Sequence, residues 1–207
     1  MMTDESLVIY NVHANFVKML GIIAWSDEGF VEKTMALLDK KSSGSVLVLN
    51  DMVEQHYRKE KLPKVGMLDK AGVLRRKLAV VFPNHPVRAA LVMKTDKKQA
   101  GSYYLFAGVP VTQPFNLTIQ ALEKSYVAIS GYGALPIESA EMVSSLAQIL
   151  SKETKRKKSK WVVFIGQHVN GGLRQIVTKD GELALTRITP IVDSDIDPGL
   201  WANEVSQ

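Results

Sequence analysis

The sequence predicts an α/β protein with two lobes, each headed by a three-strand antiparallel meander. Three β-capable runs separated by turn signals fill residues 161–189, and a similar pattern recurs at residues 7–38. Patterns typical of strands and of amphipathic helices alternate between these two segments. This repetition indicates a first lobe at 1–155 and the beginning of a second, incomplete lobe at 156–207.

The first meander is expected to have strands at 7–12, 16–23 and 30–38. Its first reversal uses the polar residues between 11 and 15, and Asp27-Glu28-Gly29 makes the second. Residues 11–15 contain no carboxylate that could hold a hydrated Mg²⁺ ion. We therefore expect no nucleotide hydrolysis at this turn.

Strands and amphipathic helices are expected to follow one another between the two meanders. The strands lie at 45–49, 87–93, 103–109 and 127–129, and the helices at 69–82, 112–126 and 138–150. Asp69 and Thr112 are the expected N-caps of the first two helices. The second helix is expected to bury Phe115, Ile119, Leu122 and Tyr126, and the third to bury Met142, Leu146, Ile149 and Leu150. The charged segment 53–62 fits either an exposed helix or an edge strand.

The second meander is expected to have strands at 162–165, 173–178 and 182–188, with Leu183 and Leu185 on one face of the last strand. Lys179-Asp180-Gly181 is typical of a tight turn, and so is Asn170-Gly171-Gly172. With Gly166, the latter turn is also compatible with a phosphate cradle, since glycines let backbone N–H groups approach an anion. No carboxylate accompanies these glycines, so weak ATP binding stays open and hydrolysis is not expected.

Composition excludes several classes of function. A chain of 207 residues with 46% apolar and 23% charged residues has the balance of an ordinary globular protein. The absence of cysteine excludes thiolate catalysis and cysteine-bound metals. No apolar run approaches the ~20 residues of a membrane span, and the polar N-terminus is not a signal peptide. Asp193, Asp195 and Asp197 lack the glycine and glutamate of a calcium loop, so we expect no metal site.

Basic residues give the chain a net charge of +5 and gather at 75–77 and 152–160. Neither cluster carries the interleaved aromatic residues that stack on bases, so nucleic-acid binding is not expected. The run at 152–160 is interpreted as a linker between lobes, with contact to anionic lipid headgroups as the alternative. His56 is interpreted as a solvated surface histidine, because no carboxylate or histidine partner stands at ligand spacing.

The order of elements from residue 7 to about residue 191 resembles that of actin-like (ASKHA) cytoplasmic domains. It is similar in particular to the type II secretion system L protein and to the type IV pilus M-type and MSHA I-type assembly proteins. The resemblance rests on three passages: the second meander with its Thr186-Arg187-Ile188-Thr189-Pro190 step, the Leu62-Pro63 step, and residues 128–136, where a strand runs into a Leu-Pro turn before a helix. It favours a strand at 53–62.

The resemblance implies a non-catalytic scaffold at the cytoplasmic face of the bacterial inner membrane, with no required cofactor. Its partners would be the assembly ATPase and the inner-membrane proteins of a secretion or pilus machine. Tyr57, Arg58, Arg75 and Arg76 are the candidate partner-binding residues. An ATP-binding regulator of pilus assembly is the alternative function, with Gly166, Asn170, Gly171 and Gly172 as its nucleotide contacts. A homodimer, and a fragment of a longer membrane-anchored protein, are further open alternatives.

Overall fold

The structure is a computed structural model that describes residues 1–39, 44–93, 101–155, 157, 159–167 and 172–189. Within this part of the chain it has a mixed α/β fold with ten strands and four helices. Two compact units interleave along the sequence. Unit 1 is formed by residues 1–25, 46–53 and 129–207, and unit 2 by residues 26–45 and 54–128. These units do not coincide with the expected lobes at 1–155 and 156–207. The division into these two lobes stays a prediction.

Unit 1 contains two small sheets that the N-terminal residues join. β1 (Ser6–Val12) and β2 (Val17–Ala24) form an antiparallel hairpin, and β3 (Val46–Asn50) pairs in parallel with β7 (Ile129–Ala134). Met2 bridges Leu7 in antiparallel fashion and Asn50 in parallel fashion. Its N–H donates to the Leu49 carbonyl at 2.8 Å, and its carbonyl accepts from the Asp51 N–H at 2.8 Å. Met2 is therefore a buried backbone link, which the polar sequence of residues 1–6 does not predict.

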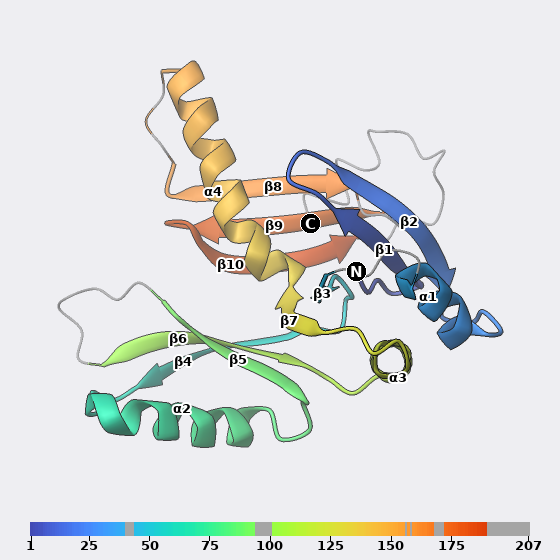
Figure 1. Ribbon diagram of the computed structural model, residues 1–207. Helices are drawn as coiled ribbons and strands as arrows, with labels where there is room; N and C mark the ends of the chain where they lie inside the picture. Colours follow the sequence, from blue (N-terminus) through green and yellow to red (C-terminus); the bar gives the residue numbers. More distant parts are fainter. Residues whose placement is uncertain (40–43, 94–100, 156, 158, 168–171, 190–207) are drawn as a thin grey trace. The chain divides into compact units, whose positions relative to one another are not determined.

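The second meander of unit 1 has the three expected strands. β8 (Trp161–Gln167), β9 (Leu173–Lys179) and β10 (Glu182–Thr189) form an antiparallel sheet in the order β10-β9-β8. The turn after β9 has positive φ at Asp180 (53°) and Gly181 (85°), as an Asp-Gly hairpin requires. Helix α4 (Leu135–Glu153) follows β7 directly and contacts all three strands (Figure 1).

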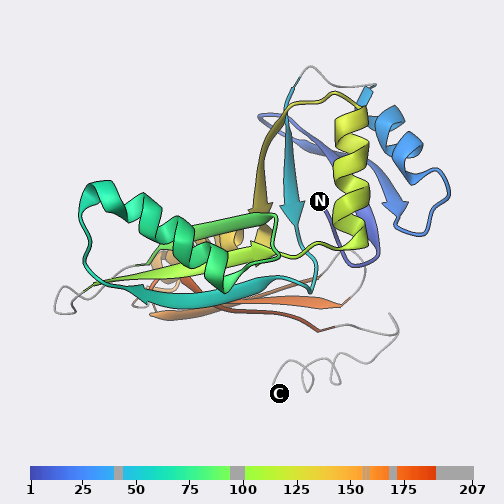
Figure 2. The ribbon, with the colours of Figure 1, turned by 90° about the horizontal axis from the view of Figure 1, so that it is seen from below.

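Unit 2 contains a three-stranded antiparallel sheet in the order β4-β6-β5, covered on one face by helix α2 (Met67–Val81) (Figure 2). The strands are β4 (His56–Leu62), β5 (Val87–Val92) and β6 (Ser102–Val109). Leu62, Phe82, Tyr104 and Phe106 form the core between helix and sheet, and Val73, Leu74, Leu78, Val81 and Ala90 pack against it. Helices α1 (Phe30–Asp39) and α3 (Gln113–Lys124) pack against each other in the same unit. The expected strands of this region, including 53–62, and the apolar stripe of the first helix are confirmed.

The expected third strand of the first meander is wrong, because residues 30–39 form α1. Phe30, Val31 and Thr34 are its buried residues, and this spacing follows the 3.6-residue period of a helix instead of the two-residue period of a strand. The Thr34 hydroxyl also donates to the Phe30 carbonyl one turn earlier, at 2.8 Å. The N-terminal meander is therefore a hairpin followed by a helix.

Four further expectations are corrected at helix and strand ends. α2 begins at Met67 after Gly66, so Asp69 lies in its first turn and is not its N-cap. Thr112 is the N-cap of α3, as expected, and its hydroxyl accepts from the Phe115 N–H at 3.2 Å. Tyr126 lies beyond the end of α3 and is 95% exposed. The strand expected at 127–129 lies at Ile129–Ala134, and Leu135-Pro136 begins α4 instead of forming a turn.

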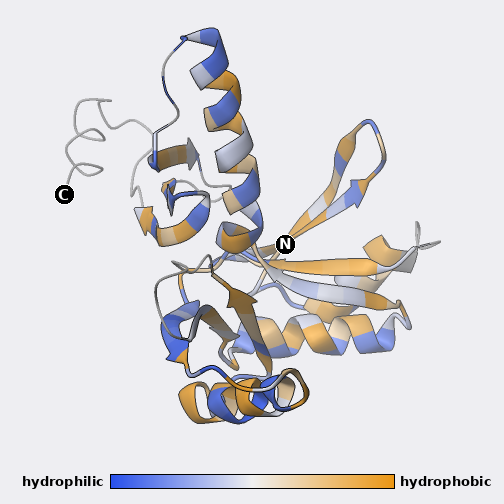
Figure 3. Ribbon diagram, turned by 90° about the vertical axis from the view of Figure 1, so that its left-hand side faces the viewer, coloured by the Kyte–Doolittle hydropathy of each residue, from blue (hydrophilic) through white to orange (hydrophobic). Residues whose placement is uncertain are grey.

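The expected buried face of the helix at 138–150 is also wrong. Met142, Leu146, Ile149 and Leu150 are all 41–58% exposed, whereas Pro136, Ala140 and Val143 are the buried residues of α4. The buried residues lie in the N-terminal half of the helix, because its C-terminal half runs past the edge of the sheet (Figure 1). Figure 3 shows hydrophobic residues recurring along α4 into this C-terminal half.

A bulge corrects the expected face of the last strand. The register between β9 and β10 shifts between Leu183 and Leu185. Leu183 is consequently buried at 9% exposure, while Leu185 is 53% exposed. A bulge inserts one residue and reverses the alternation of side chains that follows it, so the two leucines do not share a face.

Two alanine substitutions in α4 test this arrangement. We expect Val143→Ala to lower the free energy of unfolding by about 2 kcal/mol, because it removes two fully buried methyl groups. Leu146→Ala should lower it by less than about 1 kcal/mol, because its side chain is 41% exposed. Urea unfolding followed by circular dichroism measures both values. A larger loss in Leu146→Ala than in Val143→Ala would contradict the helix orientation.

Candidate functional site

A buried ion pair joins the end of β3 to β9 within unit 1. Arg174 Nη2 donates to the Asp51 carboxylate and, at 3.0 Å, to the Asp51 carbonyl oxygen. Arg174 Nη1 donates to the Thr186 hydroxyl of β10 at 3.1 Å. The side chains of Arg174 and Asp51 are 8% and 4% exposed, so both charges are removed from water. Removing one partner of such a pair lowers the free energy of unfolding, since the other partner is then a buried charge without a counter-charge.

Backbone geometry brings the two residues of the pair together. Asp51 follows β3 directly, and its N–H is held by the Met2 carbonyl at 2.8 Å. Arg174 is the second residue of β9 and follows Gly172, which has a φ of 87°. A positive φ is readily adopted by glycine, so Gly172 allows the chain to enter β9 in the orientation that places Arg174 beside Asp51.

Further polar side chains of the second meander are buried. Arg174, Gln175, Thr178 and Thr189 of the second meander are all at least nine-tenths buried. Gln175 Nε2 donates to the Thr189 hydroxyl at 3.0 Å. Because Gln175 follows Arg174 directly along β9, this bond lies on the opposite face of the sheet from the ion pair.

The Asp51–Arg174 pair does not have the donor set of a magnesium site. Mg²⁺ in nucleotide sites is held by carboxylates and phosphate oxygens. The Asp51 carboxylate is engaged by Arg174. Within the part of the chain that the structure describes, no three histidine, aspartate or glutamate side chains lie close enough together to bind a metal ion.

The expected nucleotide contacts are only partly described. Asn170 and Gly171 lie outside the described residues. Gly172 has the positive φ expected of this turn. Gly166 lies within β8, where a Cβ atom would come within 2.9 Å of the Phe164 ring. Close packing against Phe164 therefore accounts for a glycine at position 166 without any ligand.

The expected partner-binding residues do not lie on a single surface. Arg58 and the neighbouring Lys77 of α2 both contact the buried Glu60 carboxylate, at 2.7 Å and 3.3 Å. Tyr57 alternates with Arg58 along β4 and so points to the opposite face of the sheet. Arg75 and Arg76 are exposed on α2. Among the four expected residues, only Arg75 and Arg76 carry exposed charges for which the described part of the chain shows no ion pair.

His56 has a histidine partner that the sequence does not reveal. Its Nδ1 lies 2.7 Å from Nε2 of His85, which also packs against the Phe82 ring. Gly108 makes room for this arrangement, since a Cβ atom there would lie 2.8 Å from His85 Cδ2. Burial and the positive charges of His56 and Arg88 lower the pKa of His85.

Among the described helices, none is long and apolar enough to cross a membrane.

The fold of this chain is similar to that of a chain in a solved structure. A structure described as the PilM-PilN type IV pilus biogenesis complex contains a chain of similar fold, with a TM-score of 0.59 and 12% sequence identity. The likeness covers 90% of this chain and 59% of that chain. The present chain thus spans less than two thirds of the length of its structural neighbour. No family model matches the sequence, and no curated protein matches it.

The buried ion pair makes a quantitative prediction. We expect Arg174→Met to lower the free energy of unfolding by about 3–5 kcal/mol, because the Asp51 carboxylate stays buried without its guanidinium group. Adding Asp51→Asn should recover a large part of this loss, since the remaining buried charge is removed. Urea unfolding of the wild type, both single variants and the double variant measures the coupling. Additive losses in the double variant would show that the two residues do not interact.

Proposed function

We propose that this chain is a non-catalytic scaffold of a type IV pilus assembly machine, built on an actin-like fold. The observation that carries the proposal is the likeness over 90% of the chain to a chain of the PilM-PilN type IV pilus biogenesis complex. That neighbour is described in a complex with another assembly protein. By analogy, the present chain binds an inner-membrane assembly protein and the assembly ATPase at the cytoplasmic face of the inner membrane. A type II secretion machine is the related machine in which the chain would have the same role.

The charges inside unit 1 favour a scaffold over an ATP-driven enzyme. The buried carboxylate of Asp51 is paired with Arg174 and is thereby kept from a metal ion. The first reversal, at residues 11–15, has no carboxylate in its sequence. The ATP-binding regulator is the weaker alternative on the same grounds.

The exposed face of α2 is the proposed partner surface. Its inner face contributes Val73, Leu74, Leu78 and Val81 to the core of unit 2. Arg75 and Arg76 lie on the exposed side, which the core does not need. Surface charge of this kind steers association with an acidic partner and contributes to partner choice.

Loss of the chain from its host tests the proposal. We expect deletion to abolish surface pili, and the wild-type chain supplied from a plasmid to restore them. The purified chain should also capture the inner-membrane assembly protein of the same machine. Normal piliation in the deletion strain, together with no capture, would overturn the proposed function.

The absence of catalysis is tested by phosphate release. With Mg²⁺ and ATP, we expect the purified protein to release phosphate at the background rate, because the Asp51 carboxylate is held by Arg174. A steady release that disappears in a Gly171→Val variant would contradict this expectation. Heat-treated protein provides the background.

Charge reversal tests the partner surface. We expect Arg75→Glu with Arg76→Glu to weaken capture of the assembly protein at least about tenfold at low salt and to leave the melting temperature nearly unchanged. Capture by the wild type should weaken as salt exceeds about 0.1 M, where the screening length falls to about 10 Å. Lys59→Glu with Lys61→Glu is the matched control, because both lysines are exposed on β4. Equal effects of the two double reversals would reject a specific role for α2.

A further inference from the structure

Exposed lysines gather where α4 ends and the second meander of unit 1 begins. They are Lys152, Lys155, Lys157, Lys160 and Lys179, and each is exposed. The acidic residues of the same described segments are Glu153, Asp180 and Glu182. These segments thus carry five positive and three negative charges. We call the five lysines together with Trp161 the basic edge.

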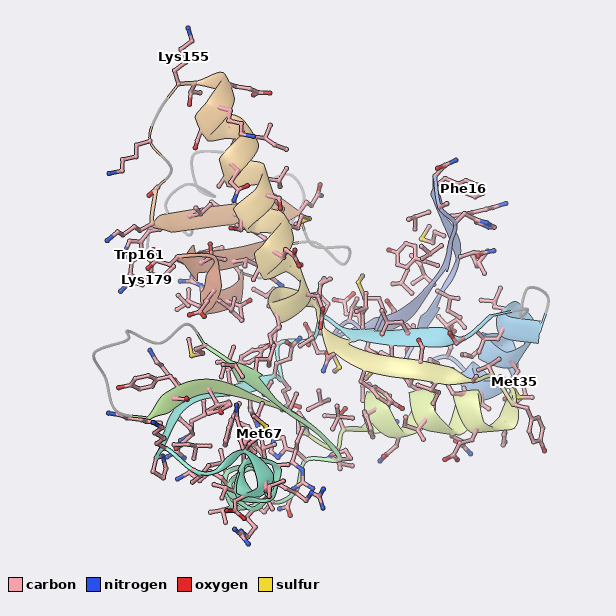
Figure 4. The ribbon with its side chains drawn as sticks, turned by 60° about the vertical axis from the view of Figure 1, so that its left-hand side comes forward. Phe16, Met35, Met67, Lys155, Trp161 and Lys179 are labelled. Carbon is pink, nitrogen blue, oxygen red and sulfur yellow. The ribbon has the colours of Figure 1, made fainter. Side chains whose placement is uncertain are left out.

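Specific contacts join the part of the basic edge that lies at the start of β8 and the end of β9. The Lys160 carbonyl accepts from the Asp180 N–H at 2.7 Å, which ties the start of β8 to the end of β9. Trp161 stands opposite Lys179 in the β-ladder, and the Lys179 Nζ lies 4.9 Å from the centre of the Trp161 ring. Figure 4 shows Trp161 and Lys179 side by side, with Lys155 beyond the end of α4 on the same side. Lys160 and Lys179 thus lie at the start of β8 with Trp161, and Lys155 lies beyond the end of α4.

Large apolar side chains accompany these charges. Trp161 is 52% exposed, and Ile149 and Leu150 of the last turns of α4 are 53% and 58% exposed. Lysine stems lie along apolar surface while their ammonium groups reach outward, and tryptophan prefers the boundary between headgroups and acyl chains. The combination of exposed lysines, one exposed tryptophan and exposed aliphatic residues is the chemistry that binds the surface of an anionic bilayer.

We propose that the basic edge is a peripheral binding site for anionic phospholipid. The lysines contact the headgroups, Trp161 enters the interfacial layer, and Ile149 and Leu150 offer further apolar surface at the end of α4. This attachment is a direct contact between the chain and lipid, and it does not depend on a protein partner.

The geometry favours lipid over nucleic acid. A base-stacking site needs an open aromatic face, whereas the Lys179 ammonium group already lies over the Trp161 ring. The aliphatic residues at the end of α4 add nothing to a phosphate-backbone contact but gain free energy on leaving water for a bilayer. A linker without a ligand would require neither the Lys179–Trp161 contact nor exposed apolar residues at the end of α4.

Vesicle flotation tests the proposal. The purified chain is mixed, in 50 mM salt, with vesicles of phosphatidylcholine alone or with 30% phosphatidylglycerol. We expect flotation only with the anionic vesicles and its loss above about 0.5 M salt, where the screening length is short. Each basic side chain near an acidic surface raises affinity about fivefold. Lys157→Glu with Lys160→Glu should therefore weaken binding at least about 20-fold, and Lys59→Glu with Lys61→Glu should leave it unchanged.

A second readout addresses Trp161 and folding. Anionic vesicles that contain brominated lipid should quench part of the tryptophan emission, and Trp161→Phe should remove that part. Melting curves establish that each variant is folded. No flotation with anionic vesicles, equal effects of the two lysine reversals, or tighter binding to a single-stranded oligonucleotide than to the vesicles would each overturn the proposal.

Discussion

The ion pair between Asp51 and Arg174 is the interaction on which the arrangement of unit 1 depends. The two residues are 123 positions apart in the sequence, and Arg174 lies in a different sheet from β3, the strand that Asp51 follows. Both are buried, so the desolvation of each charge is offset only when the other is in place. The pair consequently fixes the register of β9, because a slip by one residue would turn Arg174 to the opposite face and separate the charges.

The same division between inner and outer charges organises the rest of the molecule. In unit 2 the buried Glu60 is paired with Arg58 and Lys77, as Asp51 is with Arg174 in unit 1. By contrast, Arg75 and Arg76 on α2 and the lysines of the basic edge are exposed. Charges that stabilise the fold are thus distinct from charges that are available to partners.

The candidate site could be predicted only in part. Gly172 was expected to adopt positive φ from its turn sequence, and it does. The partnership of Asp51 with Arg174 has no local signal, because neither residue belongs to a motif and their contact arises from tertiary packing. The contact between His56 and His85 escaped for the same reason, since it depends on Gly108 of a third segment leaving space for the His85 ring.

The sequence by itself determined the elements whose signals are local. Asp180-Gly181 made a hairpin because these residues tolerate positive φ, and Thr112 capped α3 because its hydroxyl reaches a free N–H group in the first turn. Only the tertiary structure decided which apolar residues are buried. Leu146 and Leu185 are apolar residues of the kind found in cores, yet both are exposed. Leu146 is exposed because α4 extends past its sheet, and Leu185 because a bulge in β10 reverses the alternation of side chains. Burial depends on what lies opposite a side chain, and periodicity along the chain does not specify the opposing surface.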